Sequence, residues 1–343
     1  MEHLTPAAAA ASLLIISALV HGLLMGHVAE AQLVPATIIF GDSVVDVGNN
    51  NNLYTIMKAN FPPYGRDFVN HLPTGRFCNG KLATDFTVEN LGFSSYPPAY
   101  LSPQATGRNL LIGANFASAA SGYDDRTAQE YQAKVVRIVG RDKAASIFSG
   151  AIYFMSFGSS DFVQNYYINP LINHAYTVDQ YSDYLIQCFT SSVQNLYKLG
   201  ARRIGVTSLP PLGCLPASIT LFGEGSNDCV KRLNNDATSF NKKLNSTSQN
   251  LKRSLSGLKL VVFDIYNPLY NLIKNPADSG FFEGRKACCG MGTIETSLLC
   301  NPHSPGTCAN ATGYVFWDSV HPSEAANNLL AGDLLAQGID LIS

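Results

Sequence analysis

The hydrophobic pattern of the chain alternates between short apolar runs and longer amphipathic stretches. The short runs are rich in β-branched residues and are bounded by turn-forming segments, a pattern that predicts buried strands. There are four such runs: Val34 to Phe40, Ala151 to Phe157, Arg203 to Leu209, and Leu258 to Ile265.

Helical patterns lie between these runs. In the clearest one, apolar residues recur every three, four or seven positions, which places a single apolar stripe toward a core. Its members are Val230, Leu233, Ala237, Phe240, Leu244, Leu251 and Leu255. A second helix is predicted over Tyr184 to Leu199 and is ended by Gly200, and a third over Ser323 to Gln337 begins after His321-Pro322.

Strands that alternate with helices predict an α/β fold with a parallel sheet covered on both faces. No linker divides residues 32–343, so we expect a single domain. Ligands of such sheets bind outside the carboxyl ends of the strands. Gly41-Asp42-Ser43 and Gly158-Ser159-Ser160-Asp161 each follow a predicted strand directly, and we expect both at this edge.

Composition and charge exclude some classes of partner. The 343 residues include only 14% charged side chains, and the formal net charge is -2. This near-neutral balance gives no electrostatic reason to expect nucleic acid or an anionic membrane surface as a partner.

The N-terminus has the pattern of a secretory signal peptide. Residues Ala7 to Val28 are almost wholly apolar, and Ala29-Glu30-Ala31 is a small-x-small motif that predicts cleavage before Gln32. The alternative is a transmembrane anchor, because the apolar run approaches the length of a span. With cleavage, we expect a secreted protein of the extracellular space or cell wall, with no stable membrane anchor.

Eight cysteines in a chain that enters the secretory pathway favour disulfide bonds. We expect a local disulfide framework among Cys288, Cys289, Cys300 and Cys308. Cys214 and Cys229 are expected to close another loop, and Cys78 and Cys188 to stay free and buried. A zinc site is the alternative, but adjacent Cys288-Cys289 lacks Cys-x-x-Cys spacing. The sequons at Asn245 and Asn310 predict N-glycosylation.

Three residues at opposite ends of the chain have the chemistry of an acyl-transfer site. A serine hydroxyl is a weak nucleophile until an imidazole takes its proton and a carboxylate orients that imidazole. Ser43 follows its strand at a turn, and a helix beginning there would favour negative charge. Asp318 lies three residues before His321, so in a tight turn its carboxylate reaches the imidazole and leaves the other ring nitrogen for Ser43. The structural alternative makes Asp318 a helix cap and His321 a loop residue.

An ester hydrolase also needs hydrogen-bond donors for the oxyanion. Gly113, in Ile112-Gly113-Ala114-Asn115-Phe116-Ala117, offers a backbone N–H without an obstructing side chain. The N–H of Ser43 offers a second donor. The segment Gly158 to Asp161 is placed to supply a third.

The chain resembles the plant-type GDSL esterase/lipases of the SGNH hydrolase superfamily, through five motifs in order. They are Phe40-Gly41-Asp42-Ser43, Pro73-Thr74-Gly75-Arg76-Phe77, Gly113-Ala114-Asn115-Phe116-Ala117, Leu209-Pro210-Pro211-Leu212-Gly213-Cys214 and Trp317-Asp318-Ser319-Val320-His321-Pro322. The resemblance implies a three-layer α/β/α sandwich of flavodoxin-like type and no metal or organic cofactor. It also implies Ser43 as nucleophile, His321 as general base, Asp318 as its orienting group, and Ser43 and Gly113 as backbone oxyanion donors.

The sequence departs from that family pattern at two places. The third motif usually reads Gly-x-Asn-Asp, with the Asn amide in the oxyanion hole, but here Ser160 takes the position of Asn. Its shorter side chain donates one hydrogen bond and reaches less far. The segment Tyr123 to Gly150 is also shorter than in related plant sequences. The missing length would alter a wall of the acyl pocket or impair folding.

These features predict a carboxylic ester hydrolase that works through a serine acyl-enzyme on small-molecule or polymer-linked esters. Lipid esters, short-chain acyl esters and acyl groups on wall polysaccharides all remain open as substrates. Two alternatives are an acyltransferase that uses the same three residues and a non-catalytic wall-associated binding protein with a weakened oxyanion hole.

Overall fold

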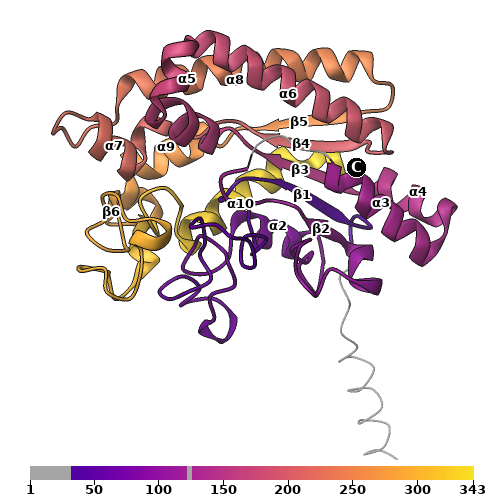
Figure 1. Ribbon diagram of the computed structural model, residues 1–343, viewed down its shortest axis with the longest axis horizontal. Helices are drawn as coiled ribbons and strands as arrows, with labels where there is room; N and C mark the ends of the chain where they lie inside the picture. The colour runs from indigo at the N-terminus through magenta and orange to yellow at the C-terminus, as the bar shows by residue number, and fades with distance from the viewer. Residues whose placement is uncertain (1–31, 122–125) are drawn as a thin grey trace, which may run out of the picture. The chain divides into compact units, whose positions relative to one another are not determined.

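A five-stranded parallel sheet forms the centre of the fold (Figure 1). The computed structural model describes residues 32–121 and 126–343, so the predicted signal peptide lies outside the described residues. The strands are β1 (Thr37–Gly41), β2 (Gly113–Asn115), β3 (Ile152–Ser156), β4 (Arg203–Thr207) and β5 (Lys259–Phe263). Their order, β2-β1-β3-β4-β5, is that of flavodoxin-like sheets. Two further strands, β6 (Glu283–Ala287) and β7 (Tyr314–Phe316), form a separate parallel pair.

Helices cover both faces of the central sheet. They are α2 (Ala83–Asn90), α3 (Arg126–Val139), α4 (Arg141–Gly150), α5 (Pro170–Ala175), α6 (Val178–Lys198), α7 (Pro216–Phe222), α8 (Lys231–Ser254), α9 (Tyr266–Lys274), α10 (Glu324–Gln337) and α11 (Ile339–Ile342). The shorter helical segments are η1 (Val69–His71), η2 (Gly107–Ile112), η3 (Asp161–Ile168), η4 (Leu212–Cys214), η5 (Pro276–Ser279), η6 (Ser297–Leu299) and η7 (Ala311–Gly313).

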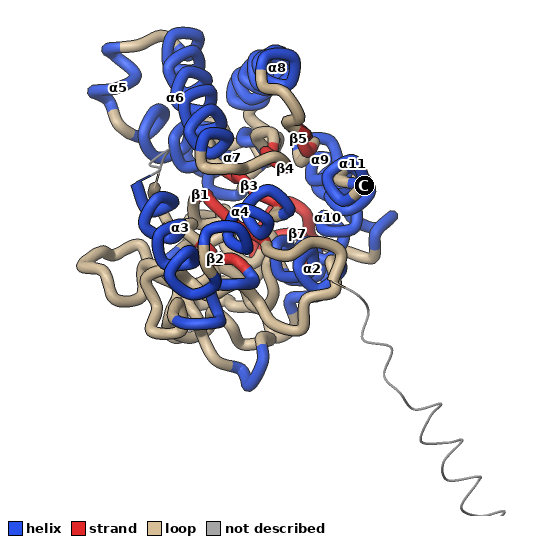
Figure 2. Tube along the Cα trace, turned by 90° about the vertical axis from the view of Figure 1, so that its right-hand side faces the viewer, coloured by secondary structure: helices blue, strands red, loops and turns tan. Residues whose placement is uncertain are grey.

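Alternate residues of the strands enter two different cores. Ile38 and Phe40 of β1 pack with buried residues of α3, α4, α6 and α8, whereas Ile39 packs with residues of α2, α10 and α11. Figure 2 shows α6 and α8 together on one side of the strands and α10 and α2 on the other. The predicted three-layer α/β/α sandwich is therefore confirmed.

The strong hydrophobic patterns also identified most of these elements correctly. All four predicted strands are present, and the predicted apolar stripe lies on α8. The helix predicted from Tyr184 instead begins at Val178, because the Thr177 side chain accepts a hydrogen bond from the Gln180 N–H and caps the first turn. In the part of the chain that the structure describes, none of the helices combines the length and the apolar character needed to cross a membrane.

Candidate active site

Ser43 lies in a tight turn at the carboxyl end of β1. The Asp42 N–H donates to the Ser156 carbonyl at 3.1 Å, and the Val45 N–H donates back to the Asp42 carbonyl at 3.3 Å. A side chain at Gly41 would collide with Val45 and with the Ser156 carbonyl, so the turn requires glycine at this close approach. No helix begins at Ser43, and the predicted helix N-terminus at this position is wrong.

His321 stands between Ser43 and Asp318. Its Nε2 is 2.7 Å from Ser43 Oγ, and its Nδ1 is 2.8 Å from Asp318 Oδ1 and 2.9 Å from Oδ2. The turn that carries these residues is held by Asp318 itself, whose Oδ1 accepts the backbone N–H groups of Val320 and His321. The ring of Phe77 packs against the imidazole, with centroids 5.0 Å apart. Both ring nitrogens are therefore engaged in the arrangement expected from the Asp-x-x-His spacing.

Two hydroxyl groups that the sequence analysis missed support the Asp318 carboxylate. Tyr64 Oη donates to Asp318 Oδ2 at 2.7 Å, and Thr296 Oγ1 donates to the same oxygen at 3.0 Å. Tyr64 is in turn held by the Ser297 N–H, which donates to its hydroxyl at 2.8 Å. Neither Tyr64 nor Thr296 belongs to a motif, and no sequence signal links their loops to Asp318.

The surroundings of Asp318 keep its carboxyl group ionised. Burial alone would raise its pKa, but the charge of His321 and the hydrogen bonds from His321, Tyr64 and the Val320 N–H outweigh burial and lower the pKa. A carboxylate that stays negative holds the Nδ1–H tautomer of the imidazole and leaves Nε2 free to accept a proton.

Asp42 ties the turn after β1 to the segment after β3. Its Oδ1 accepts from the Val44 N–H at 3.3 Å, and its Oδ2 accepts from the Ser160 N–H at 3.2 Å. Burial raises the pKa of Asp42, and hydrogen bonds from the Ser160 and Val44 N–H groups and from the Ser160 hydroxyl oppose that effect. Ser160 therefore lies at the expected edge, but both its N–H and its hydroxyl are directed to Asp42.

A second buried carboxyl, Asp161, lies next to this pair at the start of η3. Burial raises its pKa to about 6, and the nearby charge of Asp42 adds to the effect. Its Oδ2 has no hydrogen-bond partner among the described residues. Asp42 and Asp161 are thus two carboxyls that share one poorly solvated space, and no group carrying a positive charge hydrogen-bonds to Asp161 in the described part of the chain.

The prediction for Gly113 as an oxyanion donor is wrong. Gly113 is the first residue of β2 and pairs with Thr37, the first residue of β1, whereas Ser43 follows the last. At about 3.3 Å per residue, the four steps along β1 place the two ends about 13 Å apart. Glycine is needed at position 113 because an added Cβ would collide with the Thr37 carbonyl. The N–H of Ser43, by contrast, has no acceptor among the described residues.

The segment that follows β2, rather than its first glycine, runs beside the Ser43 turn. The Ser118 N–H and the Ser121 hydroxyl both donate to the Gly41 carbonyl at 3.0 Å. Asp46 holds the same segment, since its Oδ2 accepts from the Ala119 N–H at 2.9 Å, and Asn49 Nδ2 donates to the Ala117 carbonyl at 2.7 Å. The polar run after Ser43 is thus an anchor for the turn, a role that the sequence did not indicate.

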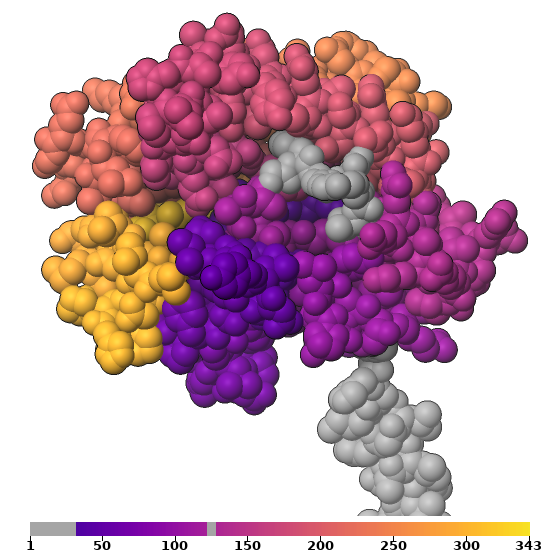
Figure 3. All heavy atoms as spheres, viewed as in Figure 1, coloured from indigo at the N-terminus to yellow at the C-terminus, as the bar shows by residue number. Residues whose placement is uncertain are grey.

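Segments that are far apart in the chain meet at this site. In the space-filling view, the indigo N-terminal segment lies against the orange-to-yellow C-terminal segment (Figure 3). Ser297 makes that contact, because its Oγ accepts from the Lys58 N–H at 3.1 Å and donates to the Ile56 carbonyl at 2.8 Å. The loop that carries Thr296 is consequently fixed to the N-terminal half of the chain.

Two disulfide bonds brace the same C-terminal region and a third closes a loop before α8, as the cysteine spacing predicted. The bonds are Cys288–Cys308, Cys289–Cys300 and Cys214–Cys229. Cys78 is free and buried as expected, whereas the free Cys188 is only half-buried. No group of three or more His, Cys, Asp and Glu side chains suited to a metal occurs in residues 32–121 and 126–343. The sequon residues Asn245 and Asn310 are both exposed.

Comparison with known proteins gives this fold and site a family. The model of the GDSL-like lipase/acylhydrolase family matches residues 38–334. GDSL esterase/lipase At5g03810 from Arabidopsis thaliana is 66% identical over 327 residues, which cover 91% of this chain and 93% of that protein. GDSL esterase/lipase APG from the same plant is 61% identical over 332 residues, with 92% and 94% covered.

A solved structure with a similar chain path is Axe2, an acetylxylan esterase from Geobacillus stearothermophilus. It is 14% identical, with a TM-score of 0.44 over 88% of this chain and 93% of that one, an overlap too weak to add to the fold description. The family model and the curated relatives decide the matter: the chain belongs to the GDSL lipase/acylhydrolase family. It is a hydrolase that acts on ester bonds.

Proposed function

We propose that this protein is a secreted carboxylic ester hydrolase in which Ser43, His321 and Asp318 form the catalytic triad. The observation that carries the proposal is the position of His321, with Nε2 at 2.7 Å from Ser43 Oγ and Nδ1 at 2.8 Å from Asp318 Oδ1. A hydroxyl and a base at this separation are within hydrogen-bond reach for proton transfer.

The reaction proceeds in two halves through an ester of Ser43. As Ser43 Oγ attacks the carbonyl carbon of the substrate, its proton passes to His321 Nε2, and the negative Asp318 stabilises the imidazolium that forms. The same proton then goes to the leaving alcohol as the carbon–oxygen bond of the substrate ester breaks. A water molecule next gives a proton to His321, attacks the acyl-Ser43 carbonyl and releases the acid, which restores the Ser43 hydroxyl.

The oxyanion that forms in each half needs donors that are aimed at it before the reaction begins. The free N–H of Ser43 is the first donor in this proposal. Ser160 is a weak second donor, because its hydroxyl and its N–H already bond to Asp42. The segment Ser118 to Ser121 passes beside Gly41, but its Ser118 and Ala119 N–H groups already bond to the Gly41 carbonyl and to Asp46, so it supports the turn.

Secretion and glycosylation are part of the same proposal. Three disulfide bonds in a chain of this size are typical of an oxidising compartment. Asn245 and Asn310 are exposed, as acceptors of N-glycans must be. Together with the apolar N-terminus, these features support cleavage before Gln32 and an extracellular or cell-wall location.

The proposal is tested by hydrolysis of p-nitrophenyl acetate and butyrate with the mature chain from Gln32 onward. Ser43→Ala and His321→Ala should each abolish turnover while circular dichroism stays unchanged. Ser319→Ala is the matched control, because Ser319 lies in the same loop as His321 and its buried Oγ has no hydrogen-bond partner among the described residues. A fluorophosphonate probe should label Ser43, as mass spectrometry of the peptides would show. Turnover that survives in Ser43→Ala would remove this residue from the mechanism.

A further inference from the structure

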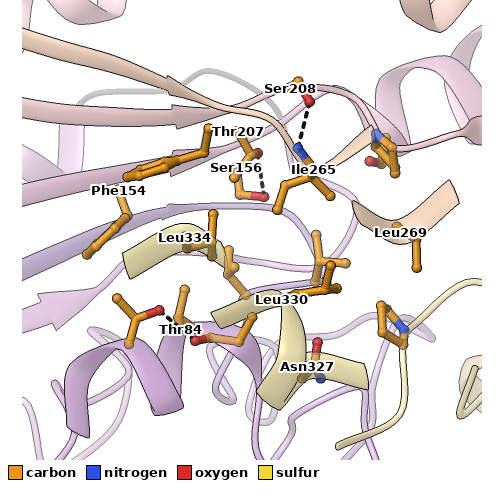
Figure 4. Close-up of a pocket in the computed structure, with 18 of the residues that line it drawn as sticks. Thr84, Phe154, Ser156, Thr207, Ser208, Ile265, Leu269, Asn327, Leu330 and Leu334 are labelled. Carbon is orange, nitrogen blue, oxygen red and sulfur yellow. Dashed lines mark hydrogen bonds between the residues drawn. The ribbon is translucent and has the colours of Figure 1, made fainter. Parts of the chain in front are cut away.

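A cavity of about 90 Å³ lies beside the candidate active site. The carboxyl ends of β3, β4 and β5 form one side of it, and α2 and α10 form the other (Figure 4). In the close-up, Phe154, Ser156, Thr207 and Ile265 face the side chains of Leu330 and Leu334 across this space. The cavity belongs to the same sheet edge as Ser43.

The chain neighbours of the candidate catalytic residues form part of the wall. Val44 and Val45 directly follow Ser43, and Val320 and Pro322 stand on either side of His321. All four line the cavity. On both the Ser43 loop and the His321 loop, the residues next to the candidate catalytic residue line the cavity. An acyl group attached to Ser43 would therefore lie close to this space.

The lining has the chemistry of an alkyl-binding site. None of the described residues that line the cavity carries a charge. Most of its hydroxyl groups are occupied by neighbours: Thr207 Oγ1 donates to Ser156 Oγ at 3.1 Å, and Ser208 Oγ accepts from the Ile265 N–H at 3.0 Å. The buried Oγ1 of Thr84, by contrast, has no hydrogen-bond partner among the described residues. Carbon atoms thus make up most of the surface that a ligand would meet.

The size of the cavity limits what it can hold. A dry cavity of about 150 Å³ binds benzene, so each carbon takes up roughly 25 Å³. By this measure, about 90 Å³ accommodates three or four carbons. An acetyl group would leave most of the space empty, and the chain of a long fatty acid would not fit within it.

We propose that this cavity binds the alkyl part of the acyl group of the substrate, and that the preferred esters are those of short aliphatic acids such as butyrate and pentanoate. This inference rests on the proposed function, because it assigns the acyl half of the same ester. Among the described side chains from Ala128 to Gly150, none lines the cavity.

The first test compares p-nitrophenyl acetate, butyrate, hexanoate and decanoate. Each methylene that becomes buried should raise kcat/KM about fourfold, so butyrate should exceed acetate by about fifteenfold. The rate should stop rising near pentanoate to hexanoate and fall for decanoate. A profile that is flat from acetate to hexanoate, or that is highest for decanoate, would overturn the assignment.

Variants on α9 provide a matched pair. Leu269 lines the cavity, whereas Leu272, on the same helix and also buried, does not. Leu269→Phe should lower the ratio of butyrate to acetate toward one, and Leu269→Ala should raise the ratio of hexanoate to butyrate severalfold. Leu272→Phe and Leu272→Ala should leave both ratios unchanged. The ratio of kcat/KM for two substrates on one preparation does not depend on the fraction of protein that is folded. Equal shifts of this ratio in the Leu269 and Leu272 variants would therefore count against the cavity.

A binding measurement separates this inference from the proposed function. Titration calorimetry of the Ser43→Ala variant with acetamide, butyramide and hexanamide reports occupancy without turnover. We expect butyramide to bind about fifteenfold more tightly than acetamide and Leu269→Phe to remove that difference. Chain-length-dependent binding in a protein that hydrolyses no ester would uphold the cavity and reject the catalytic proposal. Binding that does not depend on chain length, in an active esterase, would reject only the assignment of the cavity to the acyl group.

Discussion

Two buried carboxyl groups at the same sheet edge, Asp318 and Asp161, have opposite surroundings. Asp318 is fully buried and accepts hydrogen bonds from His321, Tyr64, Thr296 and two backbone N–H groups. Asp161 is also buried, but one of its oxygens has no partner in the described part of the chain. The pKa of Asp318 is lowered, and that of Asp161 is raised to about 6.

The difference shows that donors, not burial, decide the charge of a carboxyl at this edge. Burial acts in the same direction on both groups and is the largest single influence on each. Only Asp318 faces an imidazole and accepts enough hydrogen bonds to overcome it. A carboxylate that must steady an imidazolium needs this environment, whereas Asp161, beside the negative Asp42, is suited to holding a proton.

Replacing Asp318 should have the largest effect. In Asp318→Asn the amide cannot fix the Nδ1–H tautomer of His321, and we expect kcat to fall by about 10³- to 10⁴-fold. Asp161→Asn is the matched control, since it changes a buried carboxyl at the same edge that does not contact His321, and it should keep activity within about threefold of wild type. Steady-state kinetics at pH 8 would decide, and equal losses in the two variants would contradict the distinction drawn between them.

Removing one donor from Asp318 should have a smaller effect. A hydrogen bond to a charged group contributes about 1.5–3 kcal/mol, so Tyr64→Phe should lower kcat/KM by about tenfold or more. The hydrogen bond from Tyr64 lowers the pKa of Asp318, so its loss should raise that pKa and move the acid limb of the pH profile to higher pH. Tyr131→Phe also removes a buried hydroxyl, which donates to the Leu110 carbonyl, and serves as control. An unshifted profile in Tyr64→Phe would mean that its role is only structural.

Adding a hydrogen-bond donor at position 160, next to Asp161, should raise activity modestly. The amide of Ser160→Asn is longer than the serine hydroxyl and can extend past Asp42 toward the oxyanion, so we expect kcat to rise by about three- to tenfold with KM unchanged. Ser160→Ala should change kcat by less than about threefold if the hydroxyl serves Asp42 rather than the oxyanion. A fall of a hundredfold in Ser160→Ala would instead identify the hydroxyl as a working oxyanion donor.

The carboxyl groups with a raised pKa should also affect how stability depends on pH. This is the smallest of the expected effects. Burial raises the pKa of both Asp46 and Asp161 from 3.8 to about 6. The native state therefore binds protons that the unfolded chain has released, and the resulting stabilisation is complete below about pH 4 and lost as the pH rises through about 6. Differential scanning fluorimetry should give a Tm a few degrees higher at pH 5 than at pH 7.5. Asp161→Asn should reduce that difference, and a Tm that rises with pH would contradict it.

The parts of the molecule that depend on local pattern could be predicted from the sequence. Apolar runs located four strands of the sheet, and the Asp-x-x-His spacing located the pair that stands next to Ser43. That geometry follows from one tight turn and therefore needs only neighbouring residues. The catalytic roles of these residues, the signal peptide and the glycans stay predictions.

Features that arise from tertiary contacts had no such signal. Tyr64 is 254 positions from Asp318, and nothing in its own segment indicates which carboxylate it serves. Gly113 was assigned to the site because glycine permits close approach, but the close approach is to a neighbouring strand. The three residues of β2 are too few and too small to show a strand pattern, so the sequence does not indicate that Gly113 begins a strand.

The distance of 278 positions between Ser43 and His321 has a consequence for biosynthesis. All five central strands are encoded before residue 264, whereas the base and its carboxylate lie among the last 26 residues. A growing chain that emerges N-terminus first has its nucleophile and its complete sheet before it has its base. Under the proposed mechanism, the growing chain stays inactive until His321 has emerged and packed against Ser43, so esters met before that point are not hydrolysed.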